Sequence, residues 1–269
     1  AILFISHKLK EVTSLCHRAV ILRGGKVTGE CDPSQETPNS IARMMVGDET
    51  QLSESYPKTE TSDVILQTNN LTLSPSHPFG CGLEKVNLQL RTGEIFGLAG
   101  VAGNGQEDLL AVLSGEDTRS NADSIQWREI NIGDWDAGKR RELGLAYVPA
   151  NRLGQGAVPE MSLEENTLLT HSRALSSRGV INFPKLKQLA KQLISNNQVK
   201  CRNENSQAKS LSGGNLQKFI MGREVAQQPK VIICAHPTWG VDIGAASAIH
   251  RQLIALRDAG TAVLVVSED

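Results

Sequence analysis

One glycine-rich segment, flanked by an apolar run and an amphipathic run, constrains this chain more than any other feature. It reads Gly100-Val101-Ala102-Gly103-Asn104-Gly105-Gln106-Glu107. The apolar run 94–99 predicts a strand, and the leucines of segment 106–113 share one face of a predicted helix. Strand, glycine loop and helix in this order can surround a phosphate with backbone N–H groups. We therefore predict a phosphate-binding loop in an α/β domain; an ordinary glycine-rich turn is the alternative.

Two positions of this loop depart from the phosphate-binding pattern G-x-x-x-x-G-K-[ST]. That pattern uses a Lys to neutralise the outer phosphates and a hydroxyl to hold Mg²⁺. Gln106 stands in place of the Lys, and Glu107 stands in place of the hydroxyl. The first change removes an attractive charge, and the second adds a repulsive one. The sequence predicts a loop that binds nucleotide weakly or serves as a scaffold.

Composition excludes several classes of function. The 269 residues carry 28 basic and 29 acidic side chains, so there is no global charge bias towards nucleic acid or acidic lipid, and partners must recognise local patches. The five cysteines show no C-x-x-C spacing, which suits a reducing cytosol and argues against a disulfide scaffold or a zinc site. No apolar run approaches the roughly 20 residues of a membrane span, so we expect any membrane contact to be peripheral.

The order of patterns predicts two units. The first covers residues 1–47, with a buried strand at 2–5, a helix near 10–16, a strand and return strand around the turn at 23–26, and a helix at 40–46. A polar stretch, 48–62, predicts a linker. The second unit covers 63–269 and alternates strands with helices. Residues 2–8 align with residues 263–269, which indicates the tail of one repeat followed by most of a second copy.

A second glycine-containing motif opens another predicted helix. It reads Leu211-Ser212-Gly213-Gly214-Asn215 and continues with Leu216-Gln217-Lys218. A Ser hydroxyl and two glycine N–H groups at a helix N-terminus form an anion site. The motif resembles the signature of ATP-binding cassette (ABC) proteins. The alternative is an ordinary capped helix after a turn, with no role in binding. The resemblance implies that this signature contacts the terminal phosphate of a nucleotide held by a different cassette.

The segment after the signature helix resembles the Walker B strand and D-loop of ABC proteins. An apolar strand, 231–234, leads into Ala235 and His236, and Asp242 follows in the D-loop. In the family this strand ends in an Asp that helps to hold Mg²⁺ and a Glu that polarises the attacking water. Ala and His replace both carboxylates, so we predict no metal ligand here and assign His236 no catalytic role.

The resemblance also implies a switch residue. His7, at the end of the first predicted strand, resembles the switch histidine that contacts the γ-phosphate in ABC ATPases, and we expect it to be catalytic. The repeat places Glu268 at the corresponding position of the second copy. Every catalytic position of the second copy is thus altered, which indicates a site that does not hydrolyse ATP.

The resemblance covers essentially the whole chain, and its closest form is the tandem-cassette ATPase subunit of bacterial importers for simple sugars and nucleosides. It implies a P-loop NTPase-like α/β fold with a helical signature subdomain and an antiparallel β subdomain. It also implies ATP and Mg²⁺ as cofactors, transmembrane permease subunits as partners, a substrate-binding protein as an indirect partner, no nucleic acid, and a peripheral location on the cytoplasmic face of the plasma membrane.

The segment 147–165 lies where the family contacts its membrane subunits. Ser162 with Glu165 predicts a capping box that opens a helix there. Family members carry Pro-Glu-Asp-Arg where this chain has Pro149-Ala150-Asn151-Arg152, which removes two carboxylates. Phe79 is a weak candidate for stacking on adenine, and Trp239 is predicted to pack.

Two further hypotheses stay open. The chain could be a regulatory or structural nucleotide-binding module without turnover, because it holds no complete Walker A and B pair. A soluble ABC protein acting on ribosomes or in DNA repair would be expected to have a long charged arm or coiled coil, and the linker of roughly 16 residues is too short for either.

Overall fold

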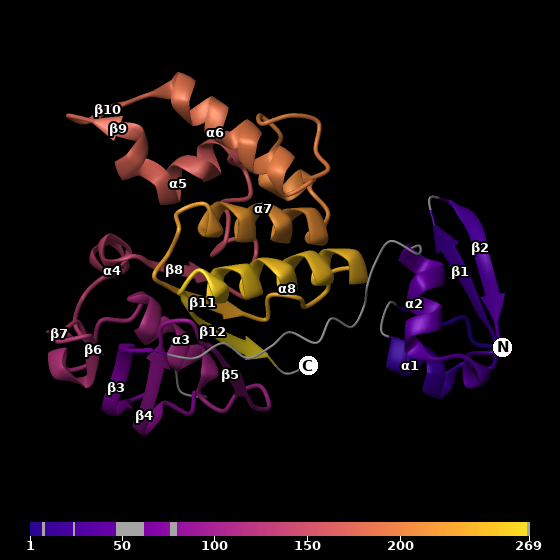
Figure 1. Cartoon of the computed structure of the whole chain (residues 1–269), viewed down its shortest axis with the longest axis horizontal. Coiled ribbons are helices and arrows are strands. Elements are labelled where there is room, and N and C mark those ends of the chain that lie inside the picture. The colour runs from indigo at the N-terminus through magenta and orange to yellow at the C-terminus, as the bar shows by residue number, and fades with distance from the viewer. Residues whose placement is uncertain (7–8, 24, 47–61, 76–79, 268–269) are drawn as a thin grey trace.

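The structure is a computed structural model that describes residues 1–6, 9–23, 25–46, 62–75 and 80–267 (Figure 1). Among the residues singled out in the sequence, His7, Phe79 and Glu268 fall outside these ranges, as does almost all of the predicted linker 48–62. Their predicted roles stay predictions.

The N-terminal unit pairs a hairpin with two helices. Its elements are α1 (Leu9–Leu15), β1 (Ala19–Arg23), β2 (Lys26–Cys31), the short 3₁₀ turn η1 (Pro33–Gln35) and α2 (Pro38–Val46). The strands β1 and β2 are antiparallel, and Arg23 pairs with Lys26 across the turn. The predicted helices, hairpin and turn of this unit are confirmed.

The prediction of a buried strand at residues 2–5 is wrong. Residues 1–6 form no strand, and the side chains of Ile2, Leu3 and Ile5 are 95%, 89% and 89% exposed. A buried strand of this apolar kind needs a hydrogen-bonded neighbour in a sheet and cover on both faces. Among the described residues, no strand pairs with this segment.

The rest of the chain contains two larger sheets. An antiparallel sheet has the order β4-β3-β6-β7, and a parallel sheet has the order β5-β12-β11-β8. Their strands are β3 (Val64–Leu73), β4 (Leu83–Arg91), β5 (Ile95–Ala99), β6 (Ile125–Trp127), β7 (Ile130–Asn131), β8 (Leu145–Val148), β11 (Val231–Ala235) and β12 (Ala262–Ser267). The parallel sheet brings the carboxyl ends of β5, β11 and β12 to one edge, since Ala235 is paired with Val266 and Ser267 with Ala99.

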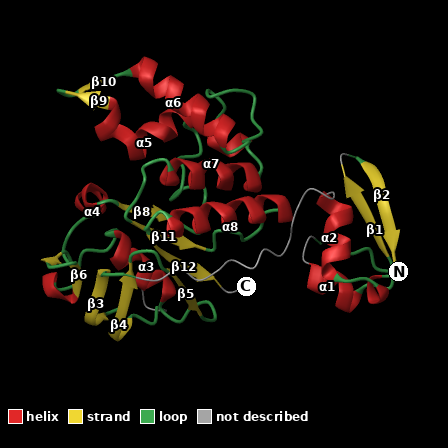
Figure 2. Cartoon of the chain, viewed as in Figure 1, coloured by secondary structure: helices red, strands yellow, loops and turns green. Residues whose placement is uncertain are grey.

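Helices cover both faces of the parallel sheet (Figure 2). The helices that pack on the sheet are α3 (Gln106–Ser114) on one face and α7 (Gly213–Val225) and α8 (Ile243–Asp258) on the other. The remaining helices of this part are α4 (Ala137–Leu143), α5 (Leu163–Leu175) and α6 (Phe183–Asn196), with 3₁₀ turns η2 (Ala122–Ser124) and η3 (Ala208–Ser210). Along β11, Ile233 and Ala235 face a core shared with α3 and the antiparallel sheet. Ile232 and Cys234 face a second core with α7 and α8. The alternation of a strand thus puts α3 and α7 on opposite faces.

The helical subdomain forms a separate layer above α7 (Figure 1). Its helices α5 and α6 are joined by a small hairpin of β9 (Ser176–Ser177) and β10 (Val180–Ile181). The predicted capping box is confirmed, because the Ser162 hydroxyl accepts from the Glu165 N–H and the Glu165 carboxylate accepts from the Ser162 N–H. The α/β fold with an antiparallel β subdomain and a helical subdomain is therefore confirmed.

A fully buried arginine fixes the helix that follows the glycine loop. Arg140, on α4, donates to the carbonyls of Val112 and Leu113 near the end of α3, and to those of Ile132 and Gly133. Burial lowers the pKa of Arg140 to about 10, so the guanidinium still carries its charge at neutral pH. A cation at the carboxyl end of α3 also interacts favourably with the helix dipole.

Within the described residues, no helix combines the length and apolarity that a membrane span requires.

Candidate nucleotide-associated sites

The glycine-rich loop connects β5 to α3, as the sequence predicts. Gly103 and Gly105 have φ values of +87° and +92°, a region that L side chains rarely adopt. Gly105 is the N-cap of α3 and is buried, and a Cβ there would lie 2.8 Å from the carbonyl oxygen of Gly82. The loop therefore depends on glycine both for its backbone conformation and for its contact with the segment before β4.

The side chain of Gln106 fills the interior of the loop. Its Oε1 accepts from the backbone N–H of Asn104 at 3.0 Å, and its Nε2 donates to the carbonyl of Val101 at 2.9 Å. A Cβ added to Gly100 would lie 2.4 Å from that Nε2. The amide thus lies within the loop and accepts from the Asn104 N–H, so this N–H is not available to an anion.

Two carboxylates stand in the first turn of α3. Glu107 is exposed, whereas Asp108 is buried and accepts from the Gly82 N–H at 3.2 Å. Acidic groups at a helix N-terminus stabilise the helix, but they repel a phosphate at the same place. The sequence reasoning missed Asp108, although its position within the first turn of the predicted helix was a usable signal.

The strand end beside the loop carries no carboxylate. Ala235 is 1% exposed at the end of β11. His236 follows with φ of +46°, donates its N–H to the Val266 carbonyl at 2.8 Å, and has its ring centroid 6.3 Å from that of Trp239. Within the described part of the chain, no group of three or more His, Cys, Asp or Glu side chains could hold a metal ion. The end of β11 therefore offers no carboxylate oxygen to a metal ion, since Ala235 and His236 stand there.

The signature segment presents a different surface. Ser212 is the N-cap of α7, and its hydroxyl caps no backbone N–H of the helix. Instead it accepts from Nδ2 of Asn215 at 2.9 Å, and Oδ1 of Asn215 accepts from the Lys200 N–H at 2.8 Å. Ser212 and Gly213 are exposed, and Gly214 is half-buried. This helix N-terminus is held in place by Asn215 and still faces solvent, which is the geometry of an open anion site.

Arg152 links the signature to two other segments, and the sequence reasoning did not assign it to the site. Its Nε donates to Oε1 of Gln217 on α7 at 2.9 Å, and its Nη2 donates to the Trp239 carbonyl. A Cβ on Gly213 would lie 2.7 Å from Nη1 of Arg152. Partial burial lowers the pKa of Arg152, but a guanidinium keeps its charge at neutral pH. The cation is therefore held beside the start of α7.

Asp242 caps the helix that follows the D-loop. Its Oδ1 accepts from the Ala245 N–H at 2.8 Å, so the carboxylate is committed to the start of α8. Its Oδ2 lies 3.8 Å from the position of a Cβ on Gly214. The D-loop and the signature are thus neighbours, whereas the glycine loop opens a helix on the other face of the sheet.

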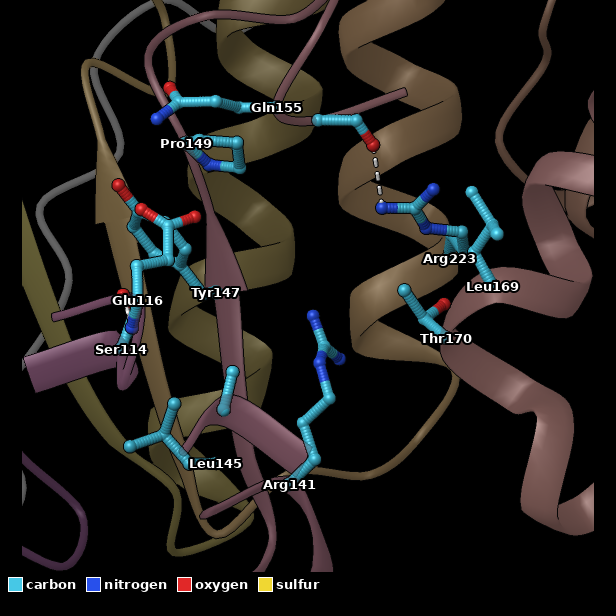
Figure 3. Close-up of a pocket in the computed structure, with 12 residues that line it drawn as sticks. Ser114, Glu116, Arg141, Leu145, Tyr147, Pro149, Gln155, Leu169, Thr170 and Arg223 are labelled. Carbon is cyan, nitrogen blue, oxygen red and sulfur yellow. Dashed lines mark hydrogen bonds between the residues drawn. The ribbon is translucent and has the colours of Figure 1, made fainter. Parts of the chain in front are cut away.

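A cleft separates the parallel sheet from the helical subdomain (Figure 3). It has a volume of about 120 Å³ and is lined by Ser114, Glu116, Ala137, Arg141, Leu145, Tyr147, Pro149, Gln155, Gly156, Leu169, Thr170 and Arg223. Ligand pockets usually have volumes of about 300–1,000 Å³, so this cleft is too small for a nucleotide. It has room for one or two side chains of a partner.

The floor of this cleft is a buried charge network. Glu224 is fully buried and pairs with Arg141 at 2.8 Å and with Arg223 at 2.9 Å. Arg223 also donates to the Gly156 carbonyl at 2.8 Å, the bond drawn in Figure 3. At the rim, burial raises the pKa of Glu116 above its usual range. The network joins α4 and the 149–156 segment to α7, which carries the signature.

Comparisons with known proteins agree with this architecture. The sequence profile of the family described as "ABC transporter" matches residues 83–239. The chain is 33% identical to the nucleoside import ATP-binding protein NupA of Lactococcus lactis subsp. cremoris, over 99% of this chain and 53% of that protein. It is 34% identical to the ribose import ATP-binding protein RbsA of Chromobacterium violaceum, over 100% of this chain and 52% of that protein.

A solved structure shares the fold. The dimeric ATP-binding cassette MJ0796, in a post-hydrolysis state bound to ADP and Pi, aligns with a TM-score of 0.64 at 22% identity and covers 76% of this chain and 88% of its own. The chain spans about half the length of the curated relatives it matches.

Proposed function

Because the chain belongs to the ABC transporter family of ATP-binding cassettes, we propose that it is part of the ATP-hydrolysing subunit of an importer for nucleosides or simple sugars. The relatives named above are import ATP-binding proteins for nucleosides and for ribose. Because this chain spans about half of their length, the transport activity of the whole protein and its solute belong to the proposal.

In this proposal the cassette at residues 63–269 works asymmetrically. Its own glycine loop is a scaffold that binds nucleotide weakly, while its signature, Leu211–Asn215, completes the ATP site of the other cassette. One observation carries this division: Gln106 fills the interior of the glycine loop, whereas the N-terminus of α7 is exposed and its Ser212 hydroxyl caps no backbone N–H.

The residues of the signature would act by positioning. When two cassettes close around MgATP, the nucleotide supplies the phosphoryl group, and hydrolysis needs that group to be held in line with a water. The Ser212 hydroxyl and the N–H groups of Gly213 and Gly214 would bind the terminal phosphate, and Asn215 would keep the hydroxyl oriented. The cation of Arg152 behind Gly213 would favour negative charge at this point.

Transmembrane permease subunits are the proposed partners, at the cytoplasmic face of the plasma membrane, and a substrate-binding protein would be an indirect partner. The cleft between Tyr147 and Leu169 supports this, because it is open to a protruding side chain and is joined to α7 by the Glu224 network. A partner that presses into the cleft would therefore move the signature.

The test compares two substitutions in a protein that carries both cassettes. Ser212→Arg should lower the rate of ATP hydrolysis by at least about 100-fold, because it fills an anion site with a bulky side chain. Gln106→Ala should change the rate by less than about two-fold. Ser210→Arg is the matched control, since Ser210 is also exposed and lies just before the motif; it should leave the rate unchanged.

Equal losses from Ser212→Arg and Gln106→Ala would overturn the asymmetric function. Tight ATP binding without turnover in the unsubstituted protein would instead support the regulatory or structural module without hydrolysis.

A further inference from the structure

The stretch between Glu165 and Glu204 carries an unusual distribution of charge. It contains seven Lys and Arg residues and no Asp or Glu, in a chain whose formal net charge is −1. The seven are Arg173, Arg178, Lys185, Lys187, Lys191, Lys200 and Arg202. This stretch holds most of α5, the β9–β10 hairpin and all of α6. The helical subdomain is therefore strongly basic, although the chain as a whole is close to neutral.

Some of these cations are neutralised within the fold. Arg173 pairs with Glu142 of α4 at 2.7 Å, and Lys187 and Lys191 lie 3.4 and 3.8 Å from Glu204. Arg178 and Lys185 form no ion pair with any described residue. Lys200 and Arg202, which follow α6, also form no ion pair with any described residue. Two of the four cations without an ion pair therefore lie at the hairpin that joins α5 to α6.

Apolar side chains stand beside this free charge. Val180 is 71% exposed on β10, and Phe183 is 61% exposed at the start of α6. Every residue from 176 to 180 and from 182 to 185 is exposed. We define these residues, 176–185, as the basic tip. Two exposed apolar side chains, and two cations that form no ion pair with a described residue, therefore lie together in this tip.

The basic tip is held by several hydrogen bonds. Ser177 pairs with Val180 across a two-residue turn, the Asn182 side chain accepts from the Lys185 N–H at 3.0 Å, and Lys185 Nζ donates to the Ala174 carbonyl at 3.1 Å. Its exposed residues are therefore presented in a fixed arrangement. Figure 1 shows the tip projecting from the ends of α5 and α6, on the side of the molecule away from the N-terminal unit and on the same side as α4.

We propose that the basic tip binds the anionic headgroups of a lipid bilayer, with Val180 and Phe183 entering the boundary between headgroups and acyl chains. Basic groups beside exposed apolar side chains are the combination that interfacial membrane binding uses. The tip is small, with two cations and one aromatic side chain, Phe183. Nucleic acid binds along extended basic surfaces with several stacking aromatics, so these features favour lipid. The proposal concerns a surface distinct from the signature and the cleft, and it does not depend on nucleotide binding.

The first experiment measures co-sedimentation of the 269-residue chain with vesicles. Vesicles of phosphatidylcholine with about 30% phosphatidylglycerol should bind the chain at low salt, and vesicles of phosphatidylcholine alone should bind it at least about ten-fold more weakly. Binding should fall steeply between low salt and about 0.5 M NaCl, because screening weakens the attraction of exposed charges. Equal binding to both vesicle types would overturn the proposal.

The second experiment locates the contact. The double variant Arg178→Glu and Lys185→Glu should reduce partitioning onto the anionic vesicles by at least about ten-fold. Val180→Ser with Phe183→Ser should reduce it by about three- to ten-fold while leaving the salt dependence intact, because it removes apolar burial and keeps the charge.

A matched control separates the basic tip from net charge. Lys26→Glu with Arg128→Glu changes the same number of exposed cations elsewhere on the chain, and this variant should bind the vesicles as the unsubstituted chain does. A control variant that loses as much binding as the tip variant would overturn the assignment. Tip variants that bind vesicles normally but lose binding to a single-stranded RNA would also overturn it, in favour of nucleic acid. All variants should keep the unfolding midpoint of the parent, since each replaced side chain is exposed.

Discussion

The start of α3 and the start of α7 are built from similar residues and offer opposite surfaces. The helix α3 begins directly after Gly105, and α7 begins with Gly213 and Gly214. The two helices lie on opposite faces of one parallel sheet. At the start of α3, the side-chain oxygen of Gln106 accepts a hydrogen bond from the Asn104 N–H. At α7 the Ser212 hydroxyl stays exposed beside Gly213. The two helix N-termini therefore differ in whether a side chain of the same loop takes up a backbone N–H group.

The difference follows from side-chain length and from the neighbours. Gln106 can reach back to the Val101 carbonyl, five residues earlier. Ser212 is too short to do so, and Asn215 holds it from the side while bonding to the Lys200 N–H. The glycine loop thus forms its hydrogen bonds within itself, whereas the signature segment is hydrogen-bonded through Asn215 to the backbone of Lys200. Three predictions test this contrast, beginning with the largest effect.

The glycines of the two motifs should differ in what they do for stability. Gly105→Ala should lower the free energy of unfolding by about 3 kcal/mol, because φ is +92° and the new Cβ would lie 2.8 Å from the Gly82 carbonyl oxygen. Gly214→Ala, where the nearest atom is 3.8 Å away, should change it by less than about 0.5 kcal/mol. Urea denaturation of the two variants measures both values, and similar losses would contradict the contrast.

Restoring the loop should create nucleotide affinity. Gln106→Lys with Glu107→Ser removes the amide that fills the loop and makes its local charge more positive by two. ATP should bind this double variant at least about ten-fold more tightly than the parent, or about 1.4 kcal/mol. Isothermal titration calorimetry gives the two dissociation constants.

Glu107→Ser alone is the control for that gain, because it removes the repulsive charge and leaves Gln106 in place. It should recover only a small part of the affinity. A single variant that equals the double one would show that charge, rather than filling of the loop, keeps nucleotide out.

The smallest effect concerns two asparagines. Asn215→Ala should cost about 1 kcal/mol of unfolding free energy, because Asn215 joins Ser212 to the Lys200 backbone. Asn104→Ala should cost less than about 0.5 kcal/mol, because the exposed Asn104 side chain bonds only to the nearby Val101 carbonyl. Thermal unfolding compares them directly, and a larger loss at Asn104 would reverse the comparison.

Local sequence patterns predicted helices and strands correctly where the described chain contains the neighbouring element against which they pack. The strand before the glycine loop, the helix after it, and the helix opened by Ser162 and Glu165 all form as expected. Residues 2–5 were predicted from the same apolar character and form no strand. A buried strand is defined by its neighbours in the sheet, and no described strand lies beside this segment.

The site was predictable only in part. The substitutions Gln106, Glu107, Ala235 and His236 are visible in the sequence, and they suffice to predict a weakened loop. The conformation of Gln106 is not visible there, because a glutamine can equally point into solvent. Arg152 was missed as a site residue, because its contacts with Gln217 and the Trp239 carbonyl join segments more than 60 residues apart.

The sequence by itself determined which groups each motif contains. The loop has Gln106 in place of a lysine, and Ala235 and His236 stand at the end of β11 in place of carboxylates. These are differences in residue identity, so no fold can supply the missing charges. Only the tertiary structure decided which N–H groups remain available, since that depends on where Gln106 and Asn215 point and what they contact. Every residue except proline carries the same backbone N–H donor. Whether such an N–H can bind a ligand therefore depends on which side chains the fold places beside it.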